Sequence, residues 1–210
     1  MAVEAKKADS APKVDVGDAT RERILAAALP LFYDKGYKGT SLAAIAKEVG
    51  ISAPALYWHF KSKRDICFAA VQDELRRFAY ALRPSATEAS PLSGLGQFVR
   101  SYVLLKLGQN ERLKEPGALG AYRQLHDALT AKQRSQLDSL QREVRDVLTG
   151  ILDAGIADGT FTVPDRTAAG YAIITMCEYV FSWAHPGGRL SAPAIADIYR
   201  DLVLSMVVTK

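Results

Sequence analysis

The sequence predicts an all-α fold, with an N-terminal unit of three helices followed by a longer helical unit. Apolar residues recur at helical spacing from about Arg21 to the end of the chain. Favourable N-cap residues precede most of these runs, and glycine or proline ends several of them. No segment shows the strict alternation of apolar and polar residues that is typical of a half-buried strand.

The individual elements follow from this spacing and from the capping residues. Residues 1–19 show no period and are rich in Ala, Lys, Asp and Pro, so we expect a disordered arm there. N-terminal helices are expected at 21–35 with Gly36 as the C-terminal cap, at 42–49 between Thr40 or Ser41 and Gly50, at 53–60 after Ser52, and after Ser62. Later helices are expected near 92–109, 118–128, 130–154 (ended by Gly155 and Gly159), 164–184 and 191–206. These boundaries divide the chain into an arm (1–19), a first domain (20–66) and a second domain (67–210).

Charge is unevenly distributed along the chain. The net charge is +4, and residues 20–66 contain eight basic and four acidic side chains, while the remainder is close to neutral. This pattern suggests a polyanionic partner at one end, although solvated basic faces are common. The two cysteines lie in apolar runs without a C-x-x-C pair, which fits a reducing, cytoplasmic location. The longest apolar stretch, 168–184, contains Glu178 and is too short to cross a membrane, so no membrane contact is expected.

The segment from Leu42 to Phe60 has the layout of a helix-turn-helix, in which the second helix enters the major groove of DNA. Small side chains at Ala53 and Ala55 would allow the N-terminus of that helix to approach DNA closely. Tyr57 and His59 are able to donate hydrogen bonds to phosphates. A corner of this kind can also serve only to pack two helices, and spacing alone leaves both interpretations open.

Specific sequence runs resemble the DNA-binding domain of the TetR/AcrR family of regulators. The matching runs are Gly36-Tyr37-Lys38-Gly39-Thr40-Ser41, Ile45-Ala46, Val49-Gly50-Ile51-Ser52, Leu56-Tyr57-Trp58-His59-Phe60 and Lys61-Ser62-Lys63. The resemblance implies a homodimer that presents two recognition helices to a near-palindromic operator in double-stranded DNA. It implies DNA contacts from Thr40, Ser41, Ser52, Ala53, Pro54, Ala55, Tyr57, His59 and Lys63, with Lys63 on a phosphate.

Two positions of this segment depart from the family pattern, and four others are not expected to contact DNA. Alanine at positions 53 and 55 replaces the Gln or Thr of other members, so direct base readout should be sparse and DNA shape should contribute. We expect Trp58 and Phe60 to belong to the protein core. Lys38 and Lys47 are expected to be solvated.

The C-terminal half is expected to dimerise and to sense a ligand. Because the helix at 168–184 is apolar nearly all round, we expect it to form a four-helix dimer interface with the last helix; burial in a monomeric core is the alternative. Candidate ligand-binding residues are Tyr102, Tyr122, His126, Tyr171, Thr175 and Glu178. An ordinary core position is the alternative for each of them, and residues at such helical spacing belong to the core more often than to a pocket.

The tail from Trp183 to Ser191, with Ile195-Ala196 and Tyr199-x-Asp201-Leu202, resembles a branch of the family that responds to acyl-CoA thioesters. This resemblance implies an apolar or acyl-CoA-type effector, for whose phosphates Arg100, Arg123, Arg142 or Arg145 could serve. The hypothesis is therefore a repressor that such a ligand releases from its operator. The alternative is a DNA-binding regulator or activator without a small-molecule effector. No metal-ligand spacing or phosphate loop is present in the sequence, so neither an enzyme nor a cofactor is expected.

Overall fold

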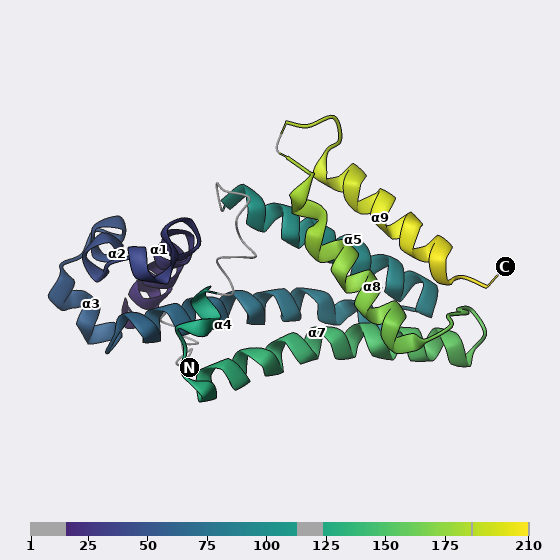
Figure 1. The fold of residues 1–210 in the computed structure, drawn as a ribbon, viewed down its shortest axis with the longest axis horizontal. Coiled ribbons are helices and arrows are strands. Elements are labelled where there is room, and N and C mark those ends of the chain that lie inside the picture. Colours follow the sequence, from purple (N-terminus) through teal and green to yellow (C-terminus); the bar gives the residue numbers. More distant parts are fainter. Residues whose placement is uncertain (1–15, 113–123, 186, 210) are drawn as a thin grey trace, which may run out of the picture.

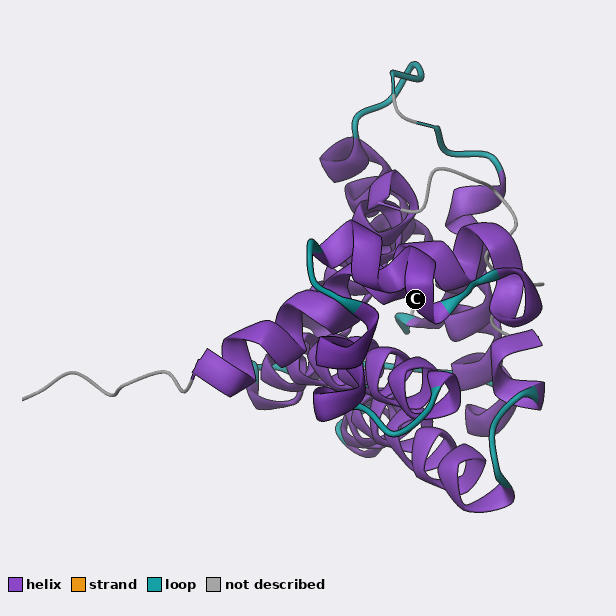
Figure 2. Ribbon diagram, turned by 90° about the vertical axis from the view of Figure 1, so that its left-hand side faces the viewer, coloured by secondary structure: helices purple, strands orange, loops and turns teal. Residues whose placement is uncertain are grey.

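The computed structural model describes residues 16–112, 124–185 and 187–209, and across these ranges the expected all-α fold is confirmed. Helices are joined by short connections (Figures 1 and 2), and the only extended pairing among the described residues is one isolated bridge between Phe161 and Val208. The helices are α1 (Val16–Gly39), α2 (Leu42–Val49), α3 (Ala53–His59), α4 (Lys63–Leu82), α5 (Pro91–Arg112), α7 (Ala131–Ala157), α8 (Arg166–Glu178) and α9 (Ala192–Val207), with 3-10 turns η1 (Arg83–Thr87) and η2 (Tyr179–Ser182).

The capping residues of the N-terminal unit lie where the sequence predicts them. Ser41, Ser52 and Ser62 each accept a hydrogen bond from the backbone N–H three residues later, at 3.1, 3.3 and 3.2 Å. Gly50 ends α2 in the left-handed region with φ of 76°, a conformation that costs glycine little. Local chemistry therefore fixes the sharp corner between α2 and α3.

The first helix differs from its expected bounds at both ends. It begins at Val16, so residues 16–19 are helical and not part of an arm, while residues 1–15 lie outside the described residues. At Gly36 the backbone leaves the helical region, with φ of 68°, and one further turn follows up to Gly39. This break redirects the chain into α2, so the expected stop at Gly36 is present as a kink.

Helix α4 connects the two units of the molecule. It begins beside α1–α3 and runs into the bundle formed by α5, α7, α8 and α9 (Figure 1). The expected domain boundary between residues 66 and 67 therefore falls inside a continuous helix. A displacement of one unit against the other has to involve this helix or its contacts.

Two hydrophobic cores are present, and the second unit contributes to the first core. Leu125, Leu129 and Leu137 pack into the cluster that otherwise consists of residues from α1 to α4, including Phe32 and Ile66. All five side chains are buried. Each buried leucine stabilises the fold by ~1.5–3 kcal/mol through the apolar surface it removes from water. The N-terminal unit is therefore completed by residues about 60 positions further along the chain.

The C-terminal helices differ from expectation at two places. Gly155 does not end α7, because it lies inside the helix with the ring of Phe161 packed over it, and a Cβ at Gly155 would lie 2.1 Å from a ring carbon. The chain instead turns at Gly159, whose φ is 80°. The helix expected at 164–184 ends at Glu178 and continues as η2. Of the helix expected near 118–128, residues 124–127 are helical and residues 113–123 lie outside the described residues.

The outer face of α8 and α9 is apolar and exposed. Tyr171, Trp183, Ile198, Leu202 and Met206 are each 43 to 59 % exposed. Trp183 stacks on Tyr199, with ring centroids 6.3 Å apart, and its indole N–H donates to the Tyr199 hydroxyl at 3.0 Å. A single chain therefore does not bury these helices on every side, which leaves exposed apolar side chains available to a second subunit.

Candidate functional site

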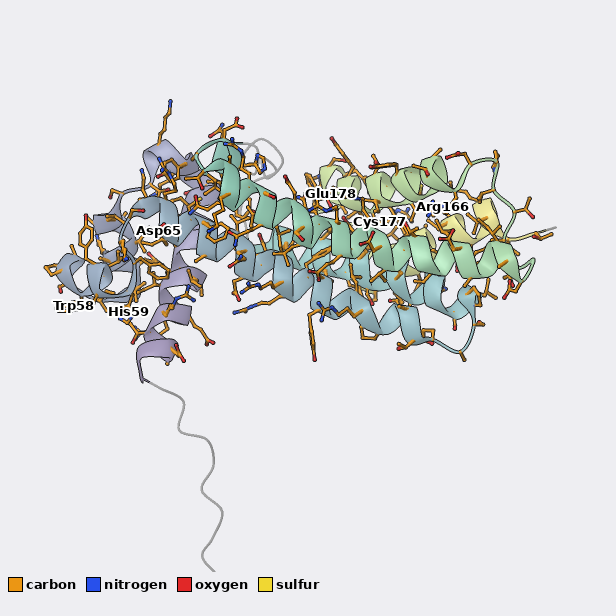
Figure 3. The ribbon with its side chains drawn as sticks, turned by 90° about the horizontal axis from the view of Figure 1, so that it is seen from below. Trp58, His59, Asp65, Arg166, Cys177 and Glu178 are labelled. Atoms are coloured by element: carbon orange, nitrogen blue, oxygen red, sulfur yellow. The ribbon has the colours of Figure 1, made fainter. Side chains whose placement is uncertain are left out.

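The α2–α3 corner forms the free end of the N-terminal unit. Leu56 on the inner side of α3 is completely buried and anchors the helix to the core. Trp58 and His59 lie at the far end of the molecule from Cys177 and Glu178, which are in the C-terminal bundle (Figure 3). The outer face of α3 is thus presented to solvent on a protruding two-helix corner, which is the geometry that the major groove of DNA accepts.

Trp58 is the main correction on this helix. The sequence predicts a core position, but the side chain is 89 % exposed, whereas Phe60 is buried as expected. At 100° per residue, Trp58 lies almost opposite the buried Leu56, together with Pro54. The resemblance of the Leu-Tyr-Trp-His-Phe run gave no information on this face, but the helical spacing from Leu56 was sufficient to place it outward.

Most of the side chains predicted to contact DNA are accessible. Ser41, Ser52, Pro54 and Tyr57 are exposed, and Ala53, Ala55 and His59 are partly exposed. The hydroxyl oxygens of both serines accept the capping bonds described above, so their hydroxyl protons remain available for a phosphate oxygen.

Thr40 does not occupy the predicted position on the DNA-facing surface. Its side chain is 1 % exposed, and its hydroxyl lies 2.9 Å from the carbonyl oxygens of both Leu31 and Gly36. The predicted phosphate contact of this side chain is therefore wrong. The hydroxyl group instead binds two backbone carbonyls beside the kink in α1.

Two basic side chains donate hydrogen bonds to backbone carbonyls next to the corner. Arg23 donates to the carbonyl of Val49 at 2.7 Å, at the C-terminus of α2. Lys63 donates to the carbonyls of Tyr37 and Thr40 at 2.8 and 2.9 Å. Cations at such carbonyls compensate the negative end of a helix dipole.

Other basic side chains of this unit are exposed. They are Arg21, Lys35, Lys38, Lys47, Lys61 and Arg64. The positive charge that surrounds α3 therefore comes from residues at the periphery of the corner, which suits attraction to a phosphate backbone.

The C-terminal domain contains a polar cluster at the edge of its apolar core. The Tyr102 hydroxyl donates to one carboxylate oxygen of Glu178 at 2.7 Å, and Lys106 Nζ donates to the other at 2.8 Å. The Lys106 and Glu178 side chains are 20 and 27 % exposed, which makes this the most buried of the ion pairs found between described residues. Lys106 also lies 5.0 Å from the centre of the Phe78 ring. The cluster thus joins α4, α5 and α8.

Electrostatics at this cluster keep Tyr102 protonated. Burial raises the pKa of Tyr102 well above its usual range, and the adjacent Glu178 carboxylate raises it further. Burial likewise raises the pKa of Cys177 to about 12, with Glu178 adding to the shift. Tyr102 therefore remains a hydrogen-bond donor throughout the physiological pH range.

Of the six predicted ligand-binding residues, the structure brings together only Tyr102 and Glu178. His126 lies near the first core with Nε2 3.5 Å from Asp138 Oδ1, and Tyr171 and Thr175 are exposed on α8 instead of facing the interior. Tyr122 lies outside the described residues. Lys106 was missed, although a lysine inside the apolar run from Val103 to Leu107 was a visible signal.

The arginines proposed as alternatives for binding CoA phosphates lie on different elements where they are described. Arg100 pairs with Asp197 at 3.0 Å and lines a groove of about 320 Å³ between the start of α5 and α9, together with Arg200. Arg142 and Arg145 are on α7, and Arg123 lies outside the described residues. The groove is open and contains neither Tyr102 nor Glu178, so it is separate from the polar cluster.

Metal clusters and membrane-spanning helices are both absent from the part of the chain that the structure describes. There, no group of three or more His, Cys, Asp or Glu residues is arranged to hold a metal ion. No described helix is both long enough and apolar enough to cross a membrane.

The fold and the exposed α2–α3 corner define a helix-turn-helix regulator of transcription. Residues 24–70 match the model of bacterial regulatory proteins of the tetR family, and residues 90–207 match that of the tetracyclin repressor-like C-terminal domain. The chain belongs to the TetR family.

Similar proteins cover nearly the whole chain. The HTH-type transcriptional repressor KstR2 of Mycolicibacterium smegmatis is 30 % identical over 190 residues, which are 88 % of each protein. The regulator PfmR of Thermus thermophilus has a similar structure, with a TM-score of 0.76 at 29 % identity over 87 % of this chain and 97 % of that one. AibR in complex with isovaleryl coenzyme A and operator DNA has the same fold, with a TM-score of 0.75 at 24 % identity over 87 % of this chain and 97 % of that one.

Proposed function

We propose that the protein is a dimeric repressor that binds a near-palindromic operator and leaves it when an acyl-CoA-type ligand binds the C-terminal domain. The observation that carries the proposal is the exposed corner of α2 and α3, with the outer face of α3 open to solvent. The protein would act in the cytoplasm, as a binding protein without catalytic activity.

The DNA-binding half of the proposal rests on the surface of α3. Pro54, Tyr57 and Trp58 would lie in the major groove, flanked by Ala53 and Ala55. Because methyl groups and an aromatic ring supply little hydrogen bonding to base edges, thymine methyl contacts and DNA shape would carry much of the specificity. Ser41, Ser52 and His59 would contact phosphates and set the orientation of the helix.

The dimer rests on the exposed apolar face of α8 and α9 described above. Two copies of this face would pack as a four-helix interface and bury side chains such as Leu202 and Met206. The symmetry of such a pair places the two recognition helices on successive turns of the major groove, which is why a near-palindromic operator is expected.

The effector half is supported by the relatives and by the polar cluster. AibR is described with isovaleryl coenzyme A bound, and the tail of this chain resembles acyl-CoA-responsive regulators. Tyr102 and Lys106 donate to different carboxylate oxygens of Glu178, and on leaving that carboxylate both could donate to an acyl carbonyl oxygen. A partly buried ion pair contributes little net stability, so a role in ligand binding gives a physical reason for its presence.

The test begins with selection of operator DNA from a random pool by the purified protein. The selected duplex is then titrated with isovaleryl-CoA and with unacylated CoA as the control. We expect an enriched near-palindrome and its release by the acylated compound. A pool without enrichment would contradict the DNA-binding half, whereas an operator that neither compound releases would favour the alternative, a regulator without this effector.

The Lys106→Met variant tests the polar cluster in the same assay. We expect it to bind the operator like the wild type and to need a higher acyl-CoA concentration for release, because one of the two donors is removed. Arg77→Met is the matched control, since it removes an exposed cation from α4 outside the cluster. Equal responses of both variants would exclude Lys106 from the effector site.

A further inference from the structure

The turn between α1 and α2 depends on two side chains for its backbone hydrogen bonding. The Thr40 hydroxyl donates to the carbonyls of Leu31 and Gly36, as described above. Two further carbonyls of this turn, those of Tyr37 and Thr40, accept hydrogen bonds from Lys63 Nζ at 2.8 and 2.9 Å. Because unpaired carbonyls at a helix end are costly when water is excluded, these bonds stabilise the conformation of the turn between α1 and α2.

The ammonium group of Lys63 makes its contacts with other groups of the protein. An ammonium group has three donors, and two of them are directed to the carbonyls just named. The group also lies 4.4 Å from the centre of the Tyr37 ring, an attractive cation–π distance. That ring in turn stacks on Phe32, with centroids 6.0 Å apart and planes inclined by 16°. Lys63 therefore has its partners on the protein side and is only partly exposed.

The position of Lys63 links three elements. It is the first residue of α4, and its two acceptors belong to the segment that leads from α1 into α2. The bonds span 23 and 26 residues of sequence. They hold the start of α2, where Ser41 is exposed, at a fixed position relative to α4.

We propose that Lys63 is a positioning residue, which holds the α1–α2 turn and the N-terminus of α2 in place and does not itself bind a DNA phosphate. This replaces the phosphate contact that the family resemblance implies for Lys63. Of the two tests that follow, only the second depends on the proposed function, because it measures DNA binding. Lys61, two residues away and exposed, is a cation of this segment that faces solvent.

The first test needs no DNA and compares Lys63→Met with Lys61→Met. Both variants remove one charge from the same segment, but only the first removes the bonds to the turn. Hydrogen exchange of the DNA-free protein should show Thr40, whose N–H donates to the Gly36 carbonyl at 3.2 Å, exchanging roughly tenfold faster in Lys63→Met. Protection equal to that of Lys61→Met would overturn the proposal, whatever the protein does to DNA.

The second test measures binding of a random-sequence DNA duplex over a range of KCl concentrations. A lost phosphate contact lowers the slope of log K against log [salt] by about 0.9. We expect Lys63→Met to bind more weakly by roughly tenfold while its slope stays equal to that of the wild type. A slope about 0.9 lower than that of the wild type would show a phosphate contact and overturn the proposal.

The Lys63→Arg variant keeps the proposal testable if Lys63→Met does not fold. Arginine preserves the charge, but its planar fork does not reproduce a compact ammonium between two carbonyls and a ring. We expect Lys63→Arg to bind DNA more weakly and to lose protection at Thr40. Wild-type DNA affinity and wild-type protection in this variant would overturn the positioning role, since charge alone would then be sufficient.

Discussion

At the scale of the residue, α3 shows how one short helix divides its side chains between two tasks. Leu56 and Phe60 face the core, and the Arg21 guanidinium lies 5.0 Å above the Phe60 ring. Trp58 faces solvent between them. A tryptophan so exposed gains nothing from burial in the free protein, so its apolar surface is available to a partner. The aromatic run is therefore partly structural and partly the surface that we propose for DNA binding.

We predict that alanine substitutions at Trp58 and Phe60 change different properties of the protein: DNA affinity in the first case and stability in the second. Trp58→Ala should leave the free energy of unfolding within ~0.5 kcal/mol of the wild type, while Phe60→Ala should lower it by ~3–5 kcal/mol. Trp58→Ala should weaken operator binding roughly tenfold. Chemical denaturation and a DNA titration measure the two quantities. Undiminished operator affinity of Trp58→Ala would remove this residue from the proposed surface.

At the scale of the element, the corner between α2 and α3 depends on its caps. Helices of 8 and 7 residues are too short to be stable alone, so capping and packing must hold them. Ser41, Gly50 and Ser52 supply the caps, and Leu56 supplies the packing. A fault at any of these positions should loosen the surface that faces DNA.

Two glycine-to-alanine changes test the backbone of this corner. Neither Gly50 nor Gly150 has an atom within 4 Å of an added Cβ, so the comparison isolates backbone conformation. Gly50→Ala should destabilise the protein by ~1–2 kcal/mol because φ is 76° there. Gly150→Ala, inside α7, should stabilise it by ~0.5–1 kcal/mol. Denaturation of the full-length protein gives both values, and a neutral Gly50→Ala would contradict the left-handed turn.

At the scale of the whole molecule, the two domains are not independent units. Leu125, Leu129 and Leu137 complete the core of the DNA-binding domain, and α4 runs unbroken into the C-terminal bundle. The polar cluster of Tyr102, Lys106 and Glu178 contacts the other end of the same helix through Phe78. A ligand that alters this cluster thus has a packed route to the recognition helix.

The outer face of α8 and α9 gives a prediction about assembly. Leu202→Glu should convert the dimer to a monomer, because a charge would be buried in the proposed interface. Ile156→Glu, which replaces an exposed apolar residue on α7, should leave the dimer intact. Sedimentation of both variants, with circular dichroism to confirm their helix content, measures the outcome. A dimer that survives Leu202→Glu would place the interface elsewhere.

Features that depend on residues close together in the sequence were predicted, and features that depend on distant residues were not. The caps at Ser52 and Ser62, the capping box of Thr130 and Gln133, and the helices they start are confirmed, since each depends on contacts within a few residues. The Tyr102–Glu178 contact joins residues that were named as separate candidates. Lys106 and the role of Lys63 were not predicted, because their partners lie 72 and 23 to 26 residues away.

By itself the sequence determined the all-α fold, the helix-turn-helix and its family, because periodicity and capping are local and the motif is contiguous. Only the tertiary structure decided that Thr40 is inside, that α7 continues past Gly155, and that the C-terminal domain completes the first core. Each of these depends on which distant atoms surround a side chain. Burial and hydrogen-bond partners are set by packing between elements, which periodicity along one element does not specify.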